Sequence, residues 1–139
     1  MIKLSQRELD LLLGNTKKSR VGSKKVIIDG HEFDSQNEGL IYWEFKHDPE
    51  IKIIKLHPKF ELTSKFKRFG KTYQPITYKA DFRIEINGLE WIIEVKSMGT
   101  LKANSKSYPM RRKLFLMRYA DLRFREIIFD GKKRTEKIY

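Results

Sequence analysis

The sequence has 139 residues, which suits a single domain with a core of its own. Lysine and arginine number 30 against 18 aspartate and glutamate residues, and the net charge of +12 favours a polyanionic partner, with nucleic acid ahead of an anionic membrane surface. The lack of cysteine excludes disulfides and thiolate metal sites, and there is no signal peptide and no apolar run of the roughly 18 residues that a membrane span needs. We therefore expect a soluble, cytoplasmic protein.

The first 25 residues are predicted to form a helix and a basic arm. Residues 5–8 have the form of a capping box, and leucines follow up to Leu13, so we expect a short helix that packs either on its own domain or on a second subunit. Residues 15–25 are polar and basic, which is typical of a mobile linker or of an arm that contacts phosphate. Asp29-Gly30 then predicts a hairpin within residues 25–33.

The main helix is predicted to begin after Ser35, its N-cap. Glu38 follows three residues later, as in a capping box, and this would give its carboxylate a purely structural role. At helical spacing, however, Glu38 shares a stripe with Ile41, Tyr42 and Phe45, so it lies on the packed face of the helix. A carboxylate on such a face needs a metal, a water or a cation as partner, and a role in a metal site is the second interpretation.

A predicted strand, residues 51–57, is followed by a segment in which aromatic and basic side chains alternate, residues 59–73, with a turn at Gly70. This mixture suits a surface that contacts a nucleic-acid backbone through its basic residues and stacks an aromatic ring on an exposed base. The purely structural interpretation is a basic hairpin with aromatic residues packed beneath it. A long strand, bent or begun again at Pro75, is expected from Tyr73 to Ile86. The predicted DNA-binding residues of this segment are Lys65, Lys67, Arg68 and Lys71.

The strongest local signal is a hairpin within residues 78–96, with Asn87-Gly88 as its two-residue type I′ turn. If Ile86 pairs with Leu89, counting back along both strands sets Asp81 directly opposite Glu94. Because side chains alternate along a strand, the two carboxylates share one face and an apolar set covers the other. The apolar set is Phe82, Ile84, Ile86, Trp91, Ile93 and Val95.

Two opposed carboxylates make a candidate metal site. Their Cβ atoms lie roughly 4.5–5.5 Å apart, where like charges repel, and a hard cation such as Mg²⁺ would offset that repulsion. Lys96, two residues beyond Glu94, would point into the same site and hold a phosphate or the attacking water. The other interpretation is a solvated sheet face on which the charges oppose one another by chance.

The C-terminal third is predicted as a flexible loop over residues 97–107, a helix over residues 109–119 and a strand over residues 122–129. The strand should run parallel to the one that ends at Val95, joined by a crossover. We expect residues 26–130 to form the main domain and residues 131–139 a frayed basic tail.

The apolar, basic and histidine side chains have different predicted roles. The helix residues expected in the core are Met110, Leu114 and Met117. The basic candidates for phosphate contact are Lys102 and Lys106 in the loop and Arg111, Arg112 and Arg118 on the solvent side of the helix. The three histidines are His31, His47 and His57. None lies at metal-ligand spacing from another, so we assign them to the surface or the core. Only His31 is kept, as a weak candidate for a site near Glu38.

Asp81, twelve intervening residues and Glu94-Val95-Lys96 resemble the PD-(D/E)XK nuclease motif, with Ala80 where that superfamily often has proline. The stretch from Asp34 to Phe129 also resembles a family of small phage-encoded proteins. The shared features are PKFEL, a segment like ITYxADF, a V-K pair and a helix like KLFLxRY.

The resemblance implies a fold, a reaction and a set of site residues. The fold would be α/β, a mixed sheet flanked by helices with an αβββαβ core, and the cofactor would be Mg²⁺ or Mn²⁺ with no nucleotide cofactor. The metal ligands would be Asp81, Glu94, the Val95 carbonyl and Glu38, and Lys96 would orient or activate the nucleophile.

The resemblance also implies a biological role. The protein would be a DNA endonuclease in the host cytoplasm, acting on branched DNA as a homodimer in the manner of phage Holliday junction resolvases. The alternatives are another PD-(D/E)XK endonuclease, whether of repair, restriction or TnsA-like type, and a DNA-binding protein that kept the fold without the catalysis.

Overall fold

The computed structural model describes residues 16–18 and 24–139, and the chain divides into two compact units, residues 1–52 and 53–139. The protein is a mixed α/β structure. The predicted helix over residues 5–13 lies outside the described residues. Among the residues that are described, no helix combines the length and the apolar character needed to cross a bilayer.

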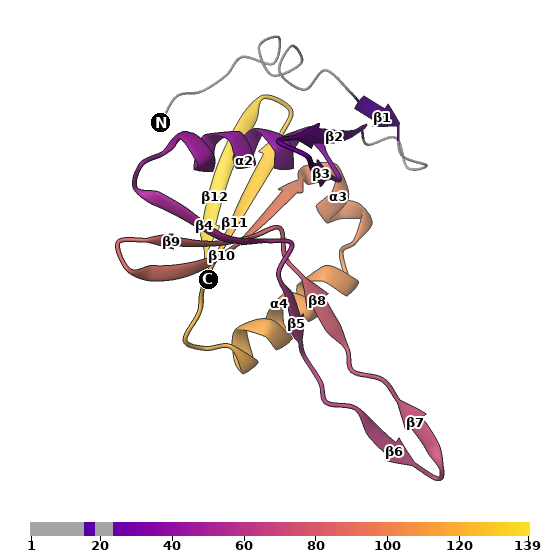
Figure 1. Cartoon of the computed structure of the whole chain (residues 1–139). Helices are drawn as coiled ribbons and strands as arrows, with labels where there is room; N and C mark the ends of the chain where they lie inside the picture. The colour runs from indigo at the N-terminus through magenta and orange to yellow at the C-terminus, as the bar shows by residue number, and fades with distance from the viewer. Residues whose placement is uncertain (1–15, 19–23) are drawn as a thin grey trace. The chain divides into compact units, whose positions relative to one another are not determined.

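The first unit pairs a small antiparallel sheet with one helix (Figure 1). The turn between its second and third strands has positive φ at both Asp29 (54°) and Gly30 (79°), which confirms the predicted hairpin. The linker predicted over residues 15–25 is wrong for the described residues of that range, because they belong to two paired strands. The elements are β1 (Thr16–Lys18), β2 (Lys24–Ile28), β3 (His31–Phe33) and α2 (Gln36–His47).

Helix α2 begins as the sequence predicts. Ser35 is its N-cap, and the Ser35 hydroxyl accepts the backbone N–H of Glu38 at 3.1 Å. The predicted stripe of Ile41, Tyr42 and Phe45 is buried, and the Tyr42 ring packs on Phe33 of β3 with ring centroids 4.9 Å apart.

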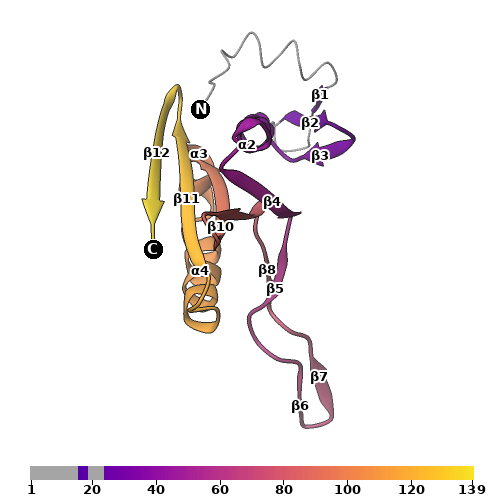
Figure 2. The ribbon, with the colours of Figure 1, turned by 60° about the vertical axis from the view of Figure 1, so that its left-hand side comes forward.

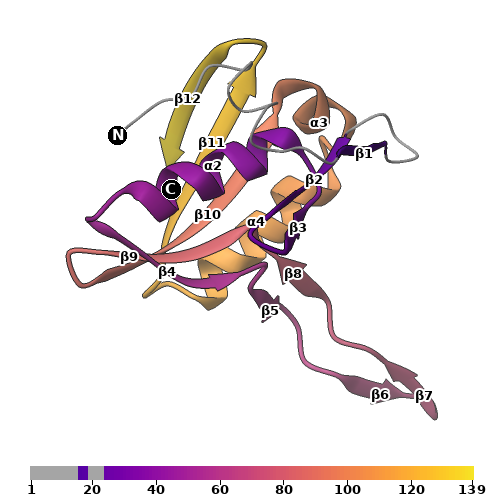
Figure 3. The same cartoon turned by 45° about the horizontal axis from the view of Figure 1, so that its top comes forward.

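The second unit is built on a five-stranded mixed sheet in the order β12-β11-β10-β9-β4 (Figure 3). Strands β10 and β11 are parallel, as predicted, whereas β9 and β12 pair antiparallel with their neighbours. The helices α3 and α4 lie between β10 and β11 in the chain, so they form the crossover that a parallel pair requires. The sheet and helix elements are β4 (Ile51–Leu56), β9 (Phe82–Ile86), β10 (Leu89–Ser97), α3 (Met98–Ala103), α4 (Ser107–Arg118), β11 (Arg123–Asp130) and β12 (Lys133–Ile138).

The core beneath α4 is aromatic. Phe115 is fully buried, and its ring packs edge-on against Phe60 and Tyr78 at centroid distances of 4.9 and 5.6 Å. The prediction that Met110 and Met117 belong to the core is wrong, since they are 60% and 74% exposed. The helix instead turns its aromatic residues inward, because flat rings fill the layer over the sheet with large apolar areas.

Three further predictions fail along the same unit. The long strand expected from Tyr73 to Ile86 is broken twice: the break at Pro75 agrees with a new start there, but a second break after Lys79 was not predicted, and the three pieces pair in three different sheets. Residues 98–103 form helix α3 instead of a loop, with Ser97 as an N-cap that accepts the Thr100 N–H at 3.1 Å. The tail expected to fray forms β12, which pairs with β11 over six residue pairs.

A narrow hairpin extends from the second unit, away from the five-stranded sheet (Figure 2). Its base is the pair β5 (Lys59–Glu61) and β8 (Thr77–Lys79), and its outer part is the pair β6 (Phe66–Arg68) and β7 (Lys71–Tyr73). The turn is Phe69-Gly70, with φ of 47° and 73°, so the predicted tip is confirmed.

Candidate functional site

The hairpin of β9 and β10 has the predicted register. Ile86 pairs with Leu89 and Phe82 with Ile93, but the regular pairing ends there. Asp81 bonds to Ile93, the partner of Phe82, so the direct pairing of Asp81 with Glu94 that the sequence predicts is not formed. The backbone N–H of Asp81 donates to the Ile93 carbonyl at 3.1 Å. The Asp81 carboxylate then accepts the Val95 N–H through Oδ2 at 2.7 Å, which fixes it beside the part of β10 that carries Glu94.

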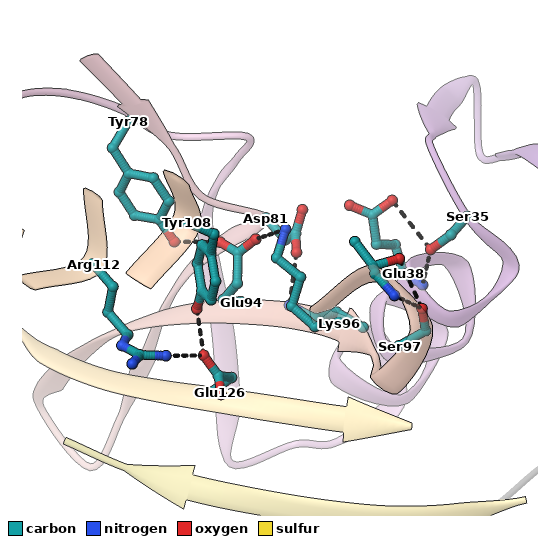
Figure 4. A network of polar contacts seen from close by, with 12 residues as sticks. Ser35, Glu38, Tyr78, Asp81, Glu94, Lys96, Ser97, Tyr108, Arg112 and Glu126 are labelled. Carbon is teal, nitrogen blue, oxygen red and sulfur yellow. Dashed lines mark hydrogen bonds and ion pairs between the residues drawn. The ribbon is translucent and has the colours of Figure 1, made fainter. Parts of the chain in front are cut away.

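Glu94 is a buried carboxylate with two identified partners. Its side chain is 4% exposed, its Oε1 lies 2.9 Å from Nζ of Lys96, and its Oε2 accepts a short hydrogen bond from the Tyr78 hydroxyl (Figure 4). Burial, followed by the negative charge of Glu94, raises the pKa of Tyr78 well above its ordinary value. Tyr78 therefore remains a donor, and the solvated charged face that the sequence left open is not what the structure contains.

A second buried glutamate, Glu126, lies directly beside Glu94 in the register of β10 and β11. Its Oε2 accepts hydrogen bonds from Tyr108 at 2.5 Å and Arg112 at 2.9 Å, and its Oε1 accepts one from Tyr139 at 3.3 Å. Sequence reasoning missed Glu126, although a charged residue inside a strand expected to be buried is a signal that it needs a partner.

Two glutamate clusters are thus formed, Glu94 with Tyr78 and Lys96, and Glu126 with Arg112 and Tyr139. Tyr108 contacts both glutamate clusters. Its hydroxyl points to Glu126, while the Lys96 ammonium lies 4.7 Å from the centre of its ring (Figure 4). Burial, followed by the charge of Glu94 and the hydrogen bond to Glu126, raises the pKa of Tyr108, so this phenol also stays protonated. Lys96 is thus held between a carboxylate and an aromatic face.

His57 lies near Asp81, a proximity that sequence spacing did not reveal. It follows β4 with φ of 50°, and its backbone N–H donates to the Asp81 carbonyl at 2.9 Å. One nitrogen of its ring and one carboxylate oxygen of Asp81 lie within 4.8 Å of each other. The sequence could not place His57 there, because its approach to Asp81 depends on how the two strands come together.

The candidate metal ligands divide between the two units. Asp81, Glu94 and Val95 belong to the second unit, and Glu38 belongs to the first turn of α2. There the Ser35 hydroxyl lies 3.3 Å from the Glu38 carboxylate, in agreement with the structural interpretation of this residue. Its role in a metal site stays a prediction.

A small polar pocket opens beside Glu94 and Lys96. Its volume is about 220 Å³. Because sites for drug-sized ligands usually occupy about 300–1,000 Å³, this pocket suits a single polar group. It is lined by Thr77, Tyr78, Lys79, Glu94, Lys96, Asn104, Ser107, Tyr108 and Arg111.

The predicted basic residues fall into two groups. The exposed ones are Lys65, Lys67, Arg68 and Lys71 on the hairpin, Lys102 and Lys106 around α3, and Arg111 on α4. The prediction that Arg112 lies on the solvent side is wrong: its side chain is 19% exposed and is engaged by Glu126. Neighbouring residues on a helix point about 100° apart, so Arg111 and Arg112 face different surroundings.

Comparison with known proteins identifies a family. A family model described as "Protein of unknown function (DUF1064)" matches residues 18–135. The protein belongs to the DUF1064 family. A search of curated proteins found no match to this DUF1064 protein. A crystal structure of SSO0001 is similar to this chain, with 16% sequence identity and a TM-score of 0.48. The match covers 73% of this chain and 47% of the SSO0001 chain, so this chain spans about half the length of that structure.

Proposed function

We propose that this DUF1064 protein is a metal-dependent DNA endonuclease of the PD-(D/E)XK type. The observation that carries the proposal is the buried Glu94 carboxylate, which is held between Lys96 and Tyr78, with the Asp81 carboxylate bonded to the next residue of β10, Val95. Burying a carboxylate beside a lysine costs desolvation free energy, and such pairs are typical of sites that bind or transfer charged groups. The net charge of +12 supports a polyanionic substrate.

The order of elements along the chain also supports this proposal. Helix α2, the strands β4, β9 and β10, helix α4 and strand β11 follow one another in the order of an αβββαβ core, with the exposed hairpin inserted between β4 and β9. Asp81 precedes the second of these strands, and Glu94 and Lys96 lie near the end of the third.

The donor set of the second unit suits a hard divalent cation. Asp81 and Glu94 offer carboxylate oxygens, and the His57 ring lies close enough to Asp81 to add a nitrogen. The backbone N–H of Val95 donates to Oδ2 of Asp81 and so holds the carboxylate in a fixed orientation. A bound Mg²⁺ or Mn²⁺ would supply Lewis acidity and positive charge to the transition state.

The residues of the chain then take separate roles. Asp81 and Glu94 would hold the cation, and the Val95 carbonyl and Glu38 would be further ligands, as the sequence resemblance implies. Lys96 donates to the nucleophile or to a phosphate oxygen, and the Tyr108 ring limits where its ammonium can lie. Tyr78 remains protonated and orients Glu94 through its hydrogen bond.

The proposed substrate is branched DNA, cut by a homodimer. Resolution of a junction needs two symmetric nicks, which a twofold axis supplies. The helix predicted over residues 5–13 is the proposed dimer contact, and deleting residues 1–14 should weaken dimerisation. Sedimentation at micromolar concentration tests this directly, since the dimer should have about twice the mass of 16.6 kDa.

One observation favours a second candidate, a DNA-binding protein without catalysis. Both oxygens of Glu94 already have partners, which is also how a structural glutamate is satisfied. The two candidates differ in whether cleavage depends on a metal and on Glu94.

The deciding experiment measures cleavage of supercoiled plasmid, linear duplex, single strands and a four-way junction, each with Mg²⁺, Mn²⁺ or a chelator. We expect metal-dependent nicking that is fastest on the junction and is lost in Glu94→Gln. Binding without cleavage in every metal would instead support the second candidate.

A further inference from the structure

We infer that the pocket beside Glu94 and Lys96 binds one phosphate of the DNA backbone, with Arg111 as its principal ligand. The inference rests on the proposed function, since it names the part of the substrate that this site would take. It adds Arg111 of α4 to the site and assigns a different role to the next residue, Arg112.

The lining of the pocket selects for an anion. It includes three cationic residues, Lys79, Lys96 and Arg111, together with neutral donors from Asn104 and Ser107. The one carboxylate in the lining, Glu94, has Lys96 and Tyr78 as partners, so its charge is compensated by Lys96 and the charges of Lys79 and Arg111 remain for an anion. A phosphodiester group carries one negative charge and two acceptor oxygens, which suits this set of donors.

Arg111 is anchored over the pocket. Its Nη1 donates to the backbone carbonyl of Thr77 at 2.7 Å, and the side chain is otherwise exposed. A guanidinium has five N–H donors in a planar fork, so the bond to Thr77 fixes its orientation and leaves donors for two phosphate oxygens. Anchoring matters because a side chain that is already ordered loses less entropy when it binds.

Arg112 cannot take this role, although it is the next residue. Its guanidinium is bonded to Glu126, lies 4.3 Å from the centre of the Tyr139 ring, and does not line the pocket. Lys113, the residue after it, is exposed on α4 and also lies outside this pocket. Lys113 therefore provides a matched control for the loss of one positive charge from the same helix.

The test compares Arg111→Gln with Lys113→Gln by measuring DNA binding to a four-way junction in chelator, where cleavage cannot occur. We expect Arg111→Gln to weaken binding roughly tenfold more than Lys113→Gln does, because a charged hydrogen bond is lost only in the former. The slope of log K against log salt should also become shallower by about 1 in Arg111→Gln alone.

A second measurement identifies the group that is bound. Junctions carrying one neutral methylphosphonate, moved along the backbone, should reveal a position where the substitution weakens the wild type but hardly affects Arg111→Gln. Arg111→Lys keeps the charge without the planar fork and should lie between the two. If Arg111→Gln does not fold, the same positional comparison with Arg111→Lys decides the question.

The outcomes separate this inference from the proposed function. Equal losses in Arg111→Gln and Lys113→Gln, with no coupled phosphate, would overturn the pocket assignment and leave the endonuclease proposal intact. A wild-type protein that binds no DNA would overturn both.

Discussion

Two regions of the second unit contain the same kinds of side chain and use them in opposite ways. In the glutamate clusters, Lys96 and Arg112 contact the Tyr108 ring and are each bonded to a buried carboxylate. On the hairpin, Arg68 lies 5.5 Å from the Phe69 ring and Lys71 lies 5.4 Å from the Tyr73 ring, and every one of these residues is exposed.

The difference lies in what compensates the charge. A buried cation must have its counter-charge within the protein, so the clusters are fixed and self-contained. The exposed cations of the hairpin are compensated by water and salt, which a polyanion can displace. We therefore expect substitutions in the clusters to change stability or catalysis, and substitutions in the hairpin to change affinity for DNA.

The largest effect is expected from Asp81→Asn. Loss of a proposed metal ligand should lower the cleavage rate by about 1,000-fold or more, since metal catalysis contributes several kcal/mol to transition-state stabilisation. Cleavage of the junction in Mg²⁺ is the measurement, with DNA affinity as an independent check. Asp121→Asn removes an exposed aspartate of the same unit and should cleave normally; full activity in Asp81→Asn would remove Asp81 from the site.

Glu126→Ala should cause the largest loss of stability. It removes the buried partner of Arg112, whose side chain is 19% exposed, and breaking such a pair costs about 3–5 kcal/mol. Urea unfolding should detect this loss, together with a fall in Tm of roughly 10 °C or more. Glu136→Ala, at an ion-paired carboxylate that is 41% exposed, should change stability by no more than about 1 kcal/mol. Similar values for the two variants would mean that the glutamate clusters do not support the fold.

Phe69→Ala should affect binding and leave stability unchanged. The side chain is 95% exposed at the tip of the hairpin, so no packing is lost. If it stacks on an unpaired base, affinity for single-stranded or branched DNA should fall by about 1–3 kcal/mol, and affinity for linear duplex should change little. Phe66→Ala serves as a comparison, because its ring already stacks on Tyr73 at 4.9 Å. Equal losses on duplex and branched DNA would argue against base stacking.

Neutralising Lys67 and Arg68 together should make the slope of log K against log salt shallower by about 1 to 2, because phosphate contacts are lost. The measurement is a salt titration of DNA binding, with unfolding in urea as the stability control. An unchanged slope would place the principal DNA-binding surface elsewhere on the protein.

The smallest effect concerns an exposed pair in the first unit. Hydrogen bonds from Lys46 and then Tyr42 lower the pKa of Asp29 below its ordinary value of 3.8. The stability that this provides is present above that ordinary value and is lost as the pH falls through the lowered pKa. Lys46→Ala should raise the pKa of Asp29 in an NMR titration. No rise would mean that the contact with Lys46 does not persist in solution.

The sequence by itself determined the features that depend on neighbouring residues. Asn87-Gly88 set the hairpin turn and hence the register of β9 against β10 from Ile86 and Leu89 to Phe82 and Ile93, because few residue pairs adopt two successive positive φ angles. Ser35 determined the start of α2 through a hydrogen bond to a backbone group three residues away.

Only the tertiary structure decided which charged side chains would be buried and with what partners. The pairing of Glu94 with Glu126, and the separation of Arg112 from Arg111, depend on how β11 and α4 lie against β10. The same holds for His57 beside Asp81, and for the tail that became β12. In each case the stabilising contact joins segments far apart in the chain, and the free energy of burial depends on the packed surroundings and not on local residue preferences.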